Sequence, residues 1–164
     1  MTFTIRPALV ADHARILALN LESEEMLSPM DAARLRALDA MSAYHRVAVD
    51  EAGEVAAFLL AFREGAGYDS PNYRWFAQHY RRFLYVDRVV VASTQQGRGL
   101  GGLLYRDLFA FAREHDVDTV TCEYYTVPPN EASRRFHAAF GFREVGSQWV
   151  ADGRKQVSLQ VAKA

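Results

Sequence analysis

The sequence lacks the marks of several protein classes. Cys122 is the single cysteine among 164 residues, which excludes an internal disulfide framework and fits a reducing compartment. Positive charge is not in excess, since 19 Lys and Arg face 20 Asp and Glu, and this balance argues against a nucleic-acid partner. No apolar run is long enough to cross a bilayer, and Arg6 and Asp12 interrupt the start of the chain where a leader would lie. We therefore expect a cytoplasmic protein without membrane contact.

What the sequence does contain is typical of one globular domain. Half of the residues are hydrophobic and 24% are charged, the balance of an ordinary globular protein. No repeat, low-complexity tract or linker divides the chain. We therefore predict a single domain over residues 1–164, long enough to bury a substantial core, and we expect no metal.

The spacing of apolar residues predicts the order of the elements. Strands are predicted at 2–6, 44–50, 54–63, 83–92, 118–126, 142–150 and 154–161. Helices are predicted at 10–26, 29–40, 100–115 and 130–140, with Asp12 as an early cap of the first. Glycine-containing turns at 50–53 and 151–153 predict two hairpins.

Two connections decide how the strands pair. The hairpin-linked strands are antiparallel, whereas strand 83–92, helix 100–115 and strand 118–126 form a βαβ unit whose two strands are parallel. This order predicts an α/β fold around one mixed sheet.

A glycine-dense turn follows the apolar β-branched run at 89–91 and leads directly into a predicted helix. Four glycines lie within six positions, Gly97, Gly99, Gly101 and Gly102. Amide groups at the start of a helix lack partners and lie at the positive end of its dipole. Glycines let the main chain approach a ligand without Cβ atoms in the way. The turn therefore predicts a site for a phosphate or pyrophosphate.

Two motifs make the chain resemble the GCN5-related N-acetyltransferase superfamily. The family signature Gln/Arg-x-x-Gly-x-Gly/Ala is matched by residues 96–101, Gln-Gly-Arg-Gly-Leu-Gly. A second family pattern places an Asn before a helix, a Tyr seven residues later and a closing Gly-Phe pair. Asn130, His137 and Gly141-Phe142 occupy those positions, so the chain departs from the pattern by carrying His in place of Tyr.

The resemblance implies a single-domain fold with a mixed central sheet of about seven strands and about four to five helices. It also implies transfer of an acetyl group from acetyl-CoA to a primary amine of a small molecule or peptide. The attack would be direct, without a covalent enzyme intermediate.

The resemblance assigns roles to individual residues. The pyrophosphate-binding amides map to Gln96, Gly97, Arg98, Gly99, Leu100, Gly101 and Gly102. The strand whose main chain pairs with the pantetheine arm maps to Val89, Val90 and Val91. Asn130 would contact the same arm, with Ser133 in the same helical turn, although capping of the helix alone would also explain Asn130. His137 takes the position that donates a proton to the departing thiolate.

An amine acceptor must lose a proton, and two carboxylates on the predicted parallel strands are candidates for the base. These are Asp87 and Glu123. A charge is unusual in a strand covered on both faces. An ion pair of Asp87 with Arg88, or with a residue across the strand, is an equally good explanation for that position.

The segment 64–82 is too long for a hairpin turn and holds five aromatic side chains. Such a segment forms a lid or a binding wall, or its aromatics pack a short helix onto the sheet. We favour a lid over the acceptor site, and we assign acceptor contacts to Tyr73, Trp75 and Tyr124.

Two other functions are compatible with parts of this pattern. Because the usual Tyr is replaced by His137, a CoA-binding sensor without turnover is the main alternative. Gly97, Gly99 and Gly102 also match the dinucleotide fingerprint, but the 62 residues that follow end in a hairpin and leave no second nucleotide-binding half. Edge strands near the C-terminus would permit a homodimer.

Overall fold

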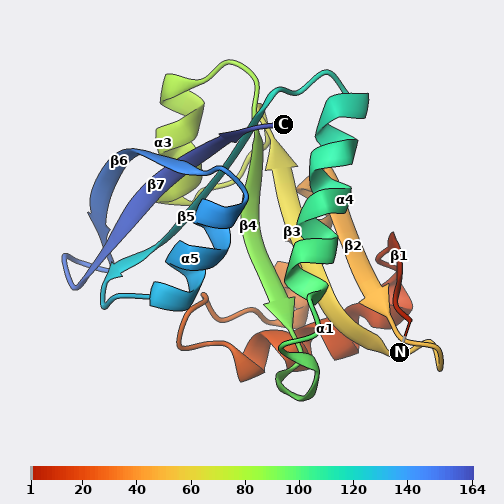
Figure 1. Cartoon of the computed structure of the whole chain (residues 1–164). Coiled ribbons are helices and arrows are strands. Elements are labelled where there is room, and N and C mark those ends of the chain that lie inside the picture. Colours follow the sequence, from red (N-terminus) through yellow and green to blue (C-terminus); the bar gives the residue numbers. More distant parts are fainter. Residues whose placement is uncertain (1) are drawn as a thin grey trace. The chain divides into compact units, whose positions relative to one another are not determined.

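The computed structural model describes residues 2–164 (Figure 1). These residues fall into two compact units. The first unit comprises residues 2–62 and 86–110, and the second comprises residues 63–85 and 111–164. Two elements run from one unit into the other: β4 (Leu84–Val91) begins in the second unit, and α4 (Leu100–Glu114) begins in the first. The prediction of a single domain over residues 1–164 stays a prediction.

The strands form a seven-stranded sheet in the order β1-β2-β3-β4-β5-β7-β6. Together with five α-helices among residues 2–164, this confirms the predicted α/β fold with a mixed sheet. The other strands are β1 (Thr4–Pro7), β2 (Tyr44–Val49), β3 (Val55–Arg63), β5 (Thr119–Val127), β6 (Arg143–Val150) and β7 (Lys155–Lys163). The other helices are α1 (His13–Glu22), α2 (Ala32–Met41), α3 (Pro71–His79) and α5 (Glu131–Ala139). Short 3-10 helices, Val10–Asp12 and Ser93–Gln95, precede α1 and α4.

In the first unit, β1, β2 and β3 pair in antiparallel fashion, so the predicted hairpin at 50–53 is confirmed. Asp107 of α4 accepts hydrogen bonds of 2.7 Å from the Tyr44 hydroxyl and 2.8 Å from the Arg46 guanidinium, which attach α4 to β2. Apolar side chains from α1, α2 and the strands form a core: Ile16, Leu19, Leu35, Val47, Val49, Val55, Phe58, Val90 and Ala92. Burial of this core supplies the main driving force for folding of the unit.

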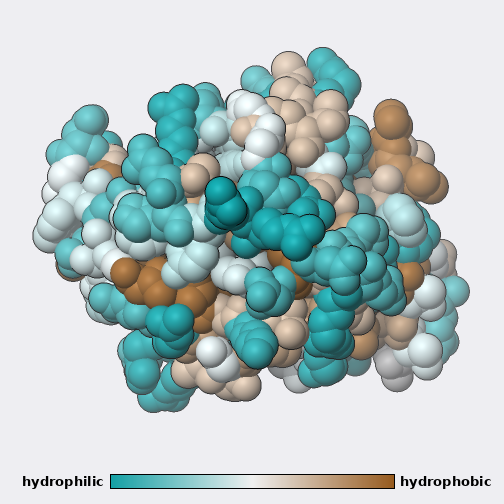
Figure 2. All heavy atoms as spheres, turned by 90° about the horizontal axis from the view of Figure 1, so that it is seen from above, coloured by the Kyte–Doolittle hydropathy of each residue, from teal (hydrophilic) through white to brown (hydrophobic). Residues whose placement is uncertain are grey.

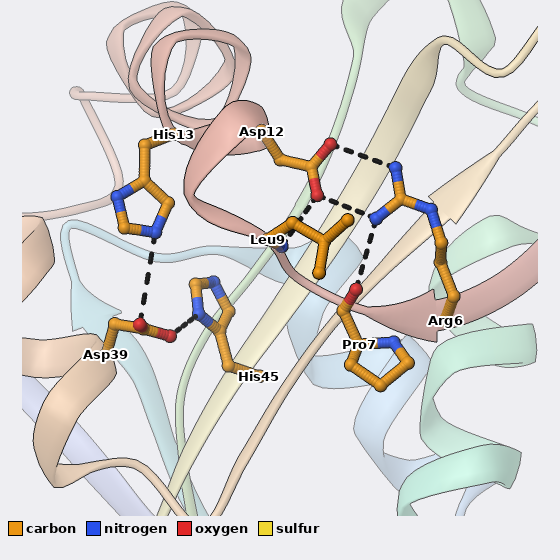
Figure 3. A network of polar contacts seen from close by, with 7 residues as sticks. All are labelled: Arg6, Pro7, Leu9, Asp12, His13, Asp39 and His45. Carbon is orange, nitrogen blue, oxygen red and sulfur yellow. Dashed lines mark hydrogen bonds and ion pairs between the residues drawn. The ribbon is translucent and has the colours of Figure 1, made fainter.

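Asp12 is the N-cap residue of α1, as expected from the sequence, but its side chain makes no hydrogen bond to the amides of that helix. Its carboxylate instead accepts hydrogen bonds of 2.7 and 2.9 Å from the Arg6 guanidinium and one of 2.8 Å from the Leu9 amide (Figure 3). The bonds from Arg6, supported by the Leu9 amide, lower the pKa of Asp12 against the opposing effect of burial. The bond from the Leu9 amide closes the start of the 3-10 helix Val10–Asp12, so the Asp12 carboxylate caps this turn while it also pairs with Arg6.

In the second unit, β5 pairs with β7 and β7 with β6, both antiparallel. The hairpin between β6 and β7 turns through Ala151, Asp152 and Gly153, which all have positive φ angles and thus confirm the predicted turn. Leu84 and Tyr85 of β4 pair in parallel with Val120 and Thr121 of β5. The parallel βαβ unit predicted from the sequence is therefore present.

The segment 64–82 contains helix α3 rather than irregular structure throughout. Ser70 accepts a hydrogen bond from the Tyr73 amide as N-cap, and Pro71 occupies the first helical position, a favoured combination at a helix start. Tyr73, Phe76, Phe83 and Tyr85 then pack ring against ring, with centroids 5.6–6.4 Å apart. The alternative in which aromatics pack a short helix onto the sheet is thus the one observed.

Helices α3 and α5 cover opposite faces of β5. Successive residues of a strand point to opposite faces, and Glu123 contacts Asn72 of α3 whereas the ring of Tyr124 lies 5.7 Å from that of His137 of α5. The two faces of one strand therefore carry two separate polar clusters.

Figure 2 shows one face on which hydrophilic residues surround small apolar patches. The large apolar side chains that are exposed are Leu9, Val10, Leu21, Met26, Val127 and Trp149, and scattered exposure of this kind is ordinary for a folded chain. Within residues 2–164, no helix combines the length and apolar character needed to span a membrane.

Candidate active site

The glycine turn before α4 adopts a backbone conformation that only glycine takes readily. Gly97 and Gly99 have φ angles of 81° and 77°, in the left-handed region that penalises a Cβ atom. A Cβ placed on either residue would meet nothing within 4 Å. Backbone conformation, rather than crowding within the protein, therefore explains these two glycines.

The start of α4 offers free main-chain donors next to this turn. The first helical hydrogen bond runs from the Leu103 amide to the Gly99 carbonyl at 2.9 Å. The amides of Leu100, Gly101 and Gly102 precede it and have no helical carbonyl to donate to. The first turn of α4 contains no acidic side chain, and Arg98 is exposed. These residues fit a diphosphate, which would accept from the amides at the positive end of the helix dipole.

Strand β4 leads into the turn through Val89, Val90 and Val91, and its buried charge is already paired. Nε of Arg88 donates a hydrogen bond of 2.7 Å to Oδ2 of Asp87, and both side chains are only 5% exposed. Arg88 also donates to Oδ1 of Asn20 at 3.0 Å. The ion-pair interpretation of Asp87 is therefore confirmed, whereas its role as a base stays a prediction.

Glu123 of β5 lies at the centre of a hydrogen-bonded network in the second unit. Its Oε1 accepts a bond of 2.8 Å from the Tyr85 hydroxyl and one of 3.1 Å from Nδ2 of Asn72. Nε2 of Gln148 in turn donates to Oδ1 of Asn72 at 2.7 Å. Hydrogen bonds donated to a carboxylate favour its ionised form, so the network suits a group that receives a proton.

Asn130 caps helix α5. Its Oδ1 accepts a hydrogen bond of 3.1 Å from the Ser133 amide, and this satisfies one of the donors at the start of the helix. The capping role is confirmed, and contact of Asn130 and Ser133 with acetyl-CoA stays a prediction.

His137 is buried on the face of α5 that packs onto the sheet, at 6% exposure. Its Nδ1 lies 2.7 Å from the Ser133 carbonyl oxygen; because a carbonyl oxygen only accepts, Nδ1 carries the proton of the neutral ring. Burial lowers the pKa of His137, against the opposing effect of the Ser133 carbonyl. At neutral pH the ring is therefore uncharged, and its position as proton donor remains a prediction.

The Gly-Phe pair that closes α5 has a packing role around the same ring. Gly141 has a φ angle of 84° and ends the helix, and the Phe142 ring meets the His137 ring edge-on at 5.3 Å. The motif thus buries His137 by turning the chain sharply and returning an aromatic side chain onto it.

Tyr124 lies on the α5 face of β5, beside His137. Its hydroxyl accepts a hydrogen bond of 3.1 Å from Nε2 of Gln160, a residue only 4% exposed. Burial raises the pKa of the Tyr124 hydroxyl, so this group stays protonated at neutral pH.

Tyr73 and Trp75, assigned above to the acceptor, are engaged within the second unit. The Tyr73 hydroxyl donates to the Arg63 carbonyl at 2.6 Å and accepts from the Ala66 amide at 3.0 Å. The Trp75 ring stacks on His79 at 3.8 Å and lies against Gly146 of β6. Both residues have a packing role, and their contact with an acceptor stays a prediction.

Three residues of the Glu123 network were not singled out from the sequence: Asn72, Tyr85 and Gln148. The Ser70-Pro71 pair is a local signal for a helix start and would have placed Asn72 in the first turn of α3. Tyr85 and Gln148 give no local signal, because only pairing and packing bring them to Glu123.

Comparisons with known proteins agree with this architecture. Ard1 of Thermoplasma volcanium has a similar fold, with a TM-score of 0.79 and 17% identity over 100% of this chain and 99% of that one. The ribosomal-protein-S18-alanine N-acetyltransferase of Escherichia coli has a TM-score of 0.73 and 16% identity over 99% and 94% of the two chains. At these identities the likeness concerns the fold alone.

Sequence comparison carries the assignment further. Over 59 residues the chain is 46% identical to the phosphinothricin N-acetyltransferase of Streptomyces coelicolor; the match takes in 36% of this chain and only a third of that relative's length. The profile of the Acetyltransferase (GNAT) family matches residues 14–142. Since this match spans well over half of the sequence and includes both motifs, the chain belongs to the acetyltransferase (GNAT) family of enzymes.

Proposed function

We propose that this protein transfers an acetyl group from acetyl-CoA to a primary amine of a small molecule or peptide. The observation that carries the proposal is the turn before α4, where Gly97 and Gly99 hold left-handed conformations and three helix-start amides follow. A diphosphate is the chemical group that such a turn accommodates. Membership of the family supports an acyl-CoA as the molecule that contains this diphosphate.

Acetyl-CoA would supply an activated acetyl group, and the chain supplies binding and proton transfer. The amides of residues 97–102 would hold the diphosphate, with Arg98 adding a positive charge from an exposed position. The main chain at 89–91 would align the pantetheine arm, and Asn130 and Ser133 would contact the same arm.

Glu123 is our preferred base for the amine proton. The Tyr85 hydroxyl and the Asn72 amide hold its carboxylate in place, whereas Asp87 is held by Arg88 in a buried ion pair. A base must be able to accept a proton without losing a buried counter-ion contact. This requirement favours Glu123 over Asp87.

His137 is the proposed proton donor to the leaving sulfur. Because Nδ1–H is bonded to the Ser133 carbonyl, Nε2 would have to take up a second proton from solvent and pass that proton to the departing sulfur. Burial disfavours the charged ring, and a negative charge developing nearby would favour it again.

Isothermal titration calorimetry with acetyl-CoA tests the binding part of the proposal. The matched variants are Gly99→Ala in the turn and Gly53→Ala in the β2–β3 hairpin, since Gly53 has a φ angle of 81° and equally open surroundings. Gly99→Ala should weaken binding by about tenfold or more, roughly 1.4 kcal/mol, and Gly53→Ala should leave it unchanged. Absence of saturable heat with the unmodified protein contradicts the proposal.

Release of free thiol from acetyl-CoA, measured over a panel of amines, tests turnover. The panel includes phosphinothricin and a peptide with an N-terminal alanine, because the similar proteins are named for these acceptors. Acceptor-dependent thiol release, with an acetylated product detected by mass spectrometry, is the expected result.

A CoA-binding sensor without turnover is the second candidate. The neutral, buried state of His137 favours it, since a neutral ring bonded through Nδ1–H has no proton to give at Nε2. Saturable binding of acetyl-CoA without thiol release for any amine on the panel would support the sensor over the enzyme.

A further inference from the structure

We propose that Asn72 is a positioning residue that orients the Glu123 carboxylate for proton transfer, and that Gln148 sets the direction in which the Asn72 amide points. The proposal rests on the proposed function, in which Glu123 is the base. It assigns a role in the reaction to helix α3, which lies outside both family motifs.

The contacts fix which end of the Asn72 amide faces Glu123. A carboxylate only accepts hydrogen bonds, so the group 3.1 Å from Oε1 of Glu123 must be the Nδ2 donor. Nε2 of Gln148 donates to the other end, Oδ1, at 2.7 Å. A reversed amide would set two donors against each other at Gln148 and two acceptors against each other at Glu123. The two neighbours therefore select one orientation of Asn72.

All three hydrogen bonds run toward the carboxylate. Gln148 donates to Asn72, Asn72 donates to Glu123, and the Tyr85 hydroxyl donates to the same Oε1 at 2.8 Å. The titratable group facing Glu123 from β4 is Tyr85, while Asn72 from α3 and Gln148 from β6 are neutral amides. Such a network favours the ionised form of Glu123, which can accept a proton, and restricts the rotation of its carboxylate.

The helix that carries Asn72 is held firmly enough to act as a support. Asn72 lies in the first turn of α3, directly after the Ser70 cap and Pro71. The next residue, Tyr73, is 2% exposed and stacks on Tyr85 at 5.6 Å, and Phe76 is fully buried. A functional group supported by packed neighbours on a regular element keeps its geometry.

The decisive variant is Asn72→Asp, tested in the full chain. It has nearly the same shape and can still accept the hydrogen bond from Gln148, but it replaces the donor facing Glu123 with a carboxylate oxygen. Two carboxylates at this distance cannot both ionise freely. We expect kcat/KM to fall by about tenfold or more and the acid limb of its pH profile to move upward by about one pH unit or more, with the KM for acetyl-CoA unchanged.

Two further variants separate positioning from a general effect of charge or packing. Gln148→Glu replaces the donor facing Asn72 with an acceptor, so the Asn72 amide should rotate and lose its bond to Glu123; kcat/KM should then fall although residue 148 keeps its place on β6. Gln78→Glu adds the same charge at an exposed position of α3 and should leave both kcat/KM and the pH profile unchanged.

A titration that does not depend on activity completes the test. NMR of protein labelled with ¹³C at glutamate side-chain carboxyls follows the ionisation of Glu123, assigned with Glu123→Gln. The Glu123 midpoint should rise in Asn72→Asp and stay put in Gln78→Glu. An unchanged midpoint in a folded Asn72→Asp protein overturns the proposal. If the midpoint rises but no amine is acetylated, the proposed function fails while the orienting contact stands. If Glu123→Gln acetylates amines as fast as the unmodified enzyme, the positioning role is overturned and the acetyltransferase activity stands.

Discussion

Nε of Arg88 lies 2.7 Å from Oδ2 of Asp87, although the two are neighbours along β4 and both side chains are 5% exposed. Arg88 also bonds to Asn20 of α1 and to the Ser28 carbonyl. The carboxylate thus serves as the counter-ion of a buried guanidinium that fastens the end of α1 and the segment after it to β4. A buried pair of this kind is expensive to break from one side, because the remaining charge loses its partner.

Asp87→Ala should therefore destabilise the protein by about 3–5 kcal/mol, the usual cost of leaving a buried charge unpaired. Urea-induced unfolding followed by tryptophan fluorescence measures this change. Glu131→Gln is the matched control, because it breaks an ion pair with Arg134 whose two side chains are each 54% exposed; its unfolding midpoint should not move measurably. If the Asp87→Ala protein is as stable as the unmodified protein but inactive, the result supports Asp87 as the base.

His137→Ala should lower kcat more than it weakens binding of acetyl-CoA. The proposed role is confined to the chemical step, where general acid catalysis contributes about a hundredfold or more. Steady-state kinetics with the best amine of the panel, together with calorimetry, separates the two effects. Equal turnover in the variant would remove His137 from the mechanism, and a parallel loss of binding and stability would leave it with the packing role that Phe142 indicates.

His45 in the first unit is buried, as His137 is in the second unit, and its protonation is coupled to folding. Nδ1 of His45 lies 2.6 Å from Asp39, and His13 approaches the same carboxylate at 4.0 Å (Figure 3). Burial lowers the pKa of His45 below its ordinary value, and the hydrogen bond to Asp39 opposes this shift in part. The unfolded chain then takes up a proton at a higher pH than the folded protein does.

Stability should consequently fall as the pH drops below about 6.5, the pKa of an unfolded histidine. The loss continues until the pH passes the lower pKa of the folded state, and it has the same sign for His137. Each histidine contributes at most about 1.4 kcal/mol per pH unit. Urea unfolding at pH 7.5 and 5.5 measures the difference, and His45→Gln should make it smaller. If the free energy of unfolding changes equally between the two pH values in the variant, protonation of His45 does not contribute to the pH dependence of stability.

Local chemistry explains which parts of the fold and site the sequence predicts. The turn at 96–102, the β6–β7 hairpin and the helix closed by Gly141 each depend on residues adjacent in the chain, and each was predicted. The aromatic residues of segment 64–82 favour a lid over the acceptor site when only the sequence is considered. Ser70 and Pro71 nevertheless mark the start of helix α3.

Long-range contacts set the limit of such prediction. Asp12 has the sequence position of a cap, but the additional pairing of its carboxylate with Arg6 of the neighbouring strand does not follow from that position. Glu123 was a candidate from the sequence, but its partners Asn72 and Tyr85 are 51 and 38 residues away along the chain. Contacts of this kind follow from strand order and helix packing, which no local pattern of residue types encodes.

The contact between Gly146 and Trp75 provides a sharp test of how α3 packs. A Cβ atom on Gly146, which sits at an irregularity in the β6–β7 pairing, would lie 2.6 Å from the Trp75 ring. Gly146→Ala should destabilise the protein by about 1–3 kcal/mol through overpacking, and Trp75→Leu in the same chain should recover part of that loss by removing the ring. Gly65→Ala is the control for an unobstructed position of the same unit, where φ is 83° and nothing lies within 4 Å of an added Cβ. Trp75→Leu should not relieve the strain of this control variant.

Urea unfolding of the single and double variants gives the coupling free energy between residues 75 and 146. Additive effects would mean that Trp75 does not rest on Gly146, and the ring would then be available for the acceptor contact predicted from the sequence.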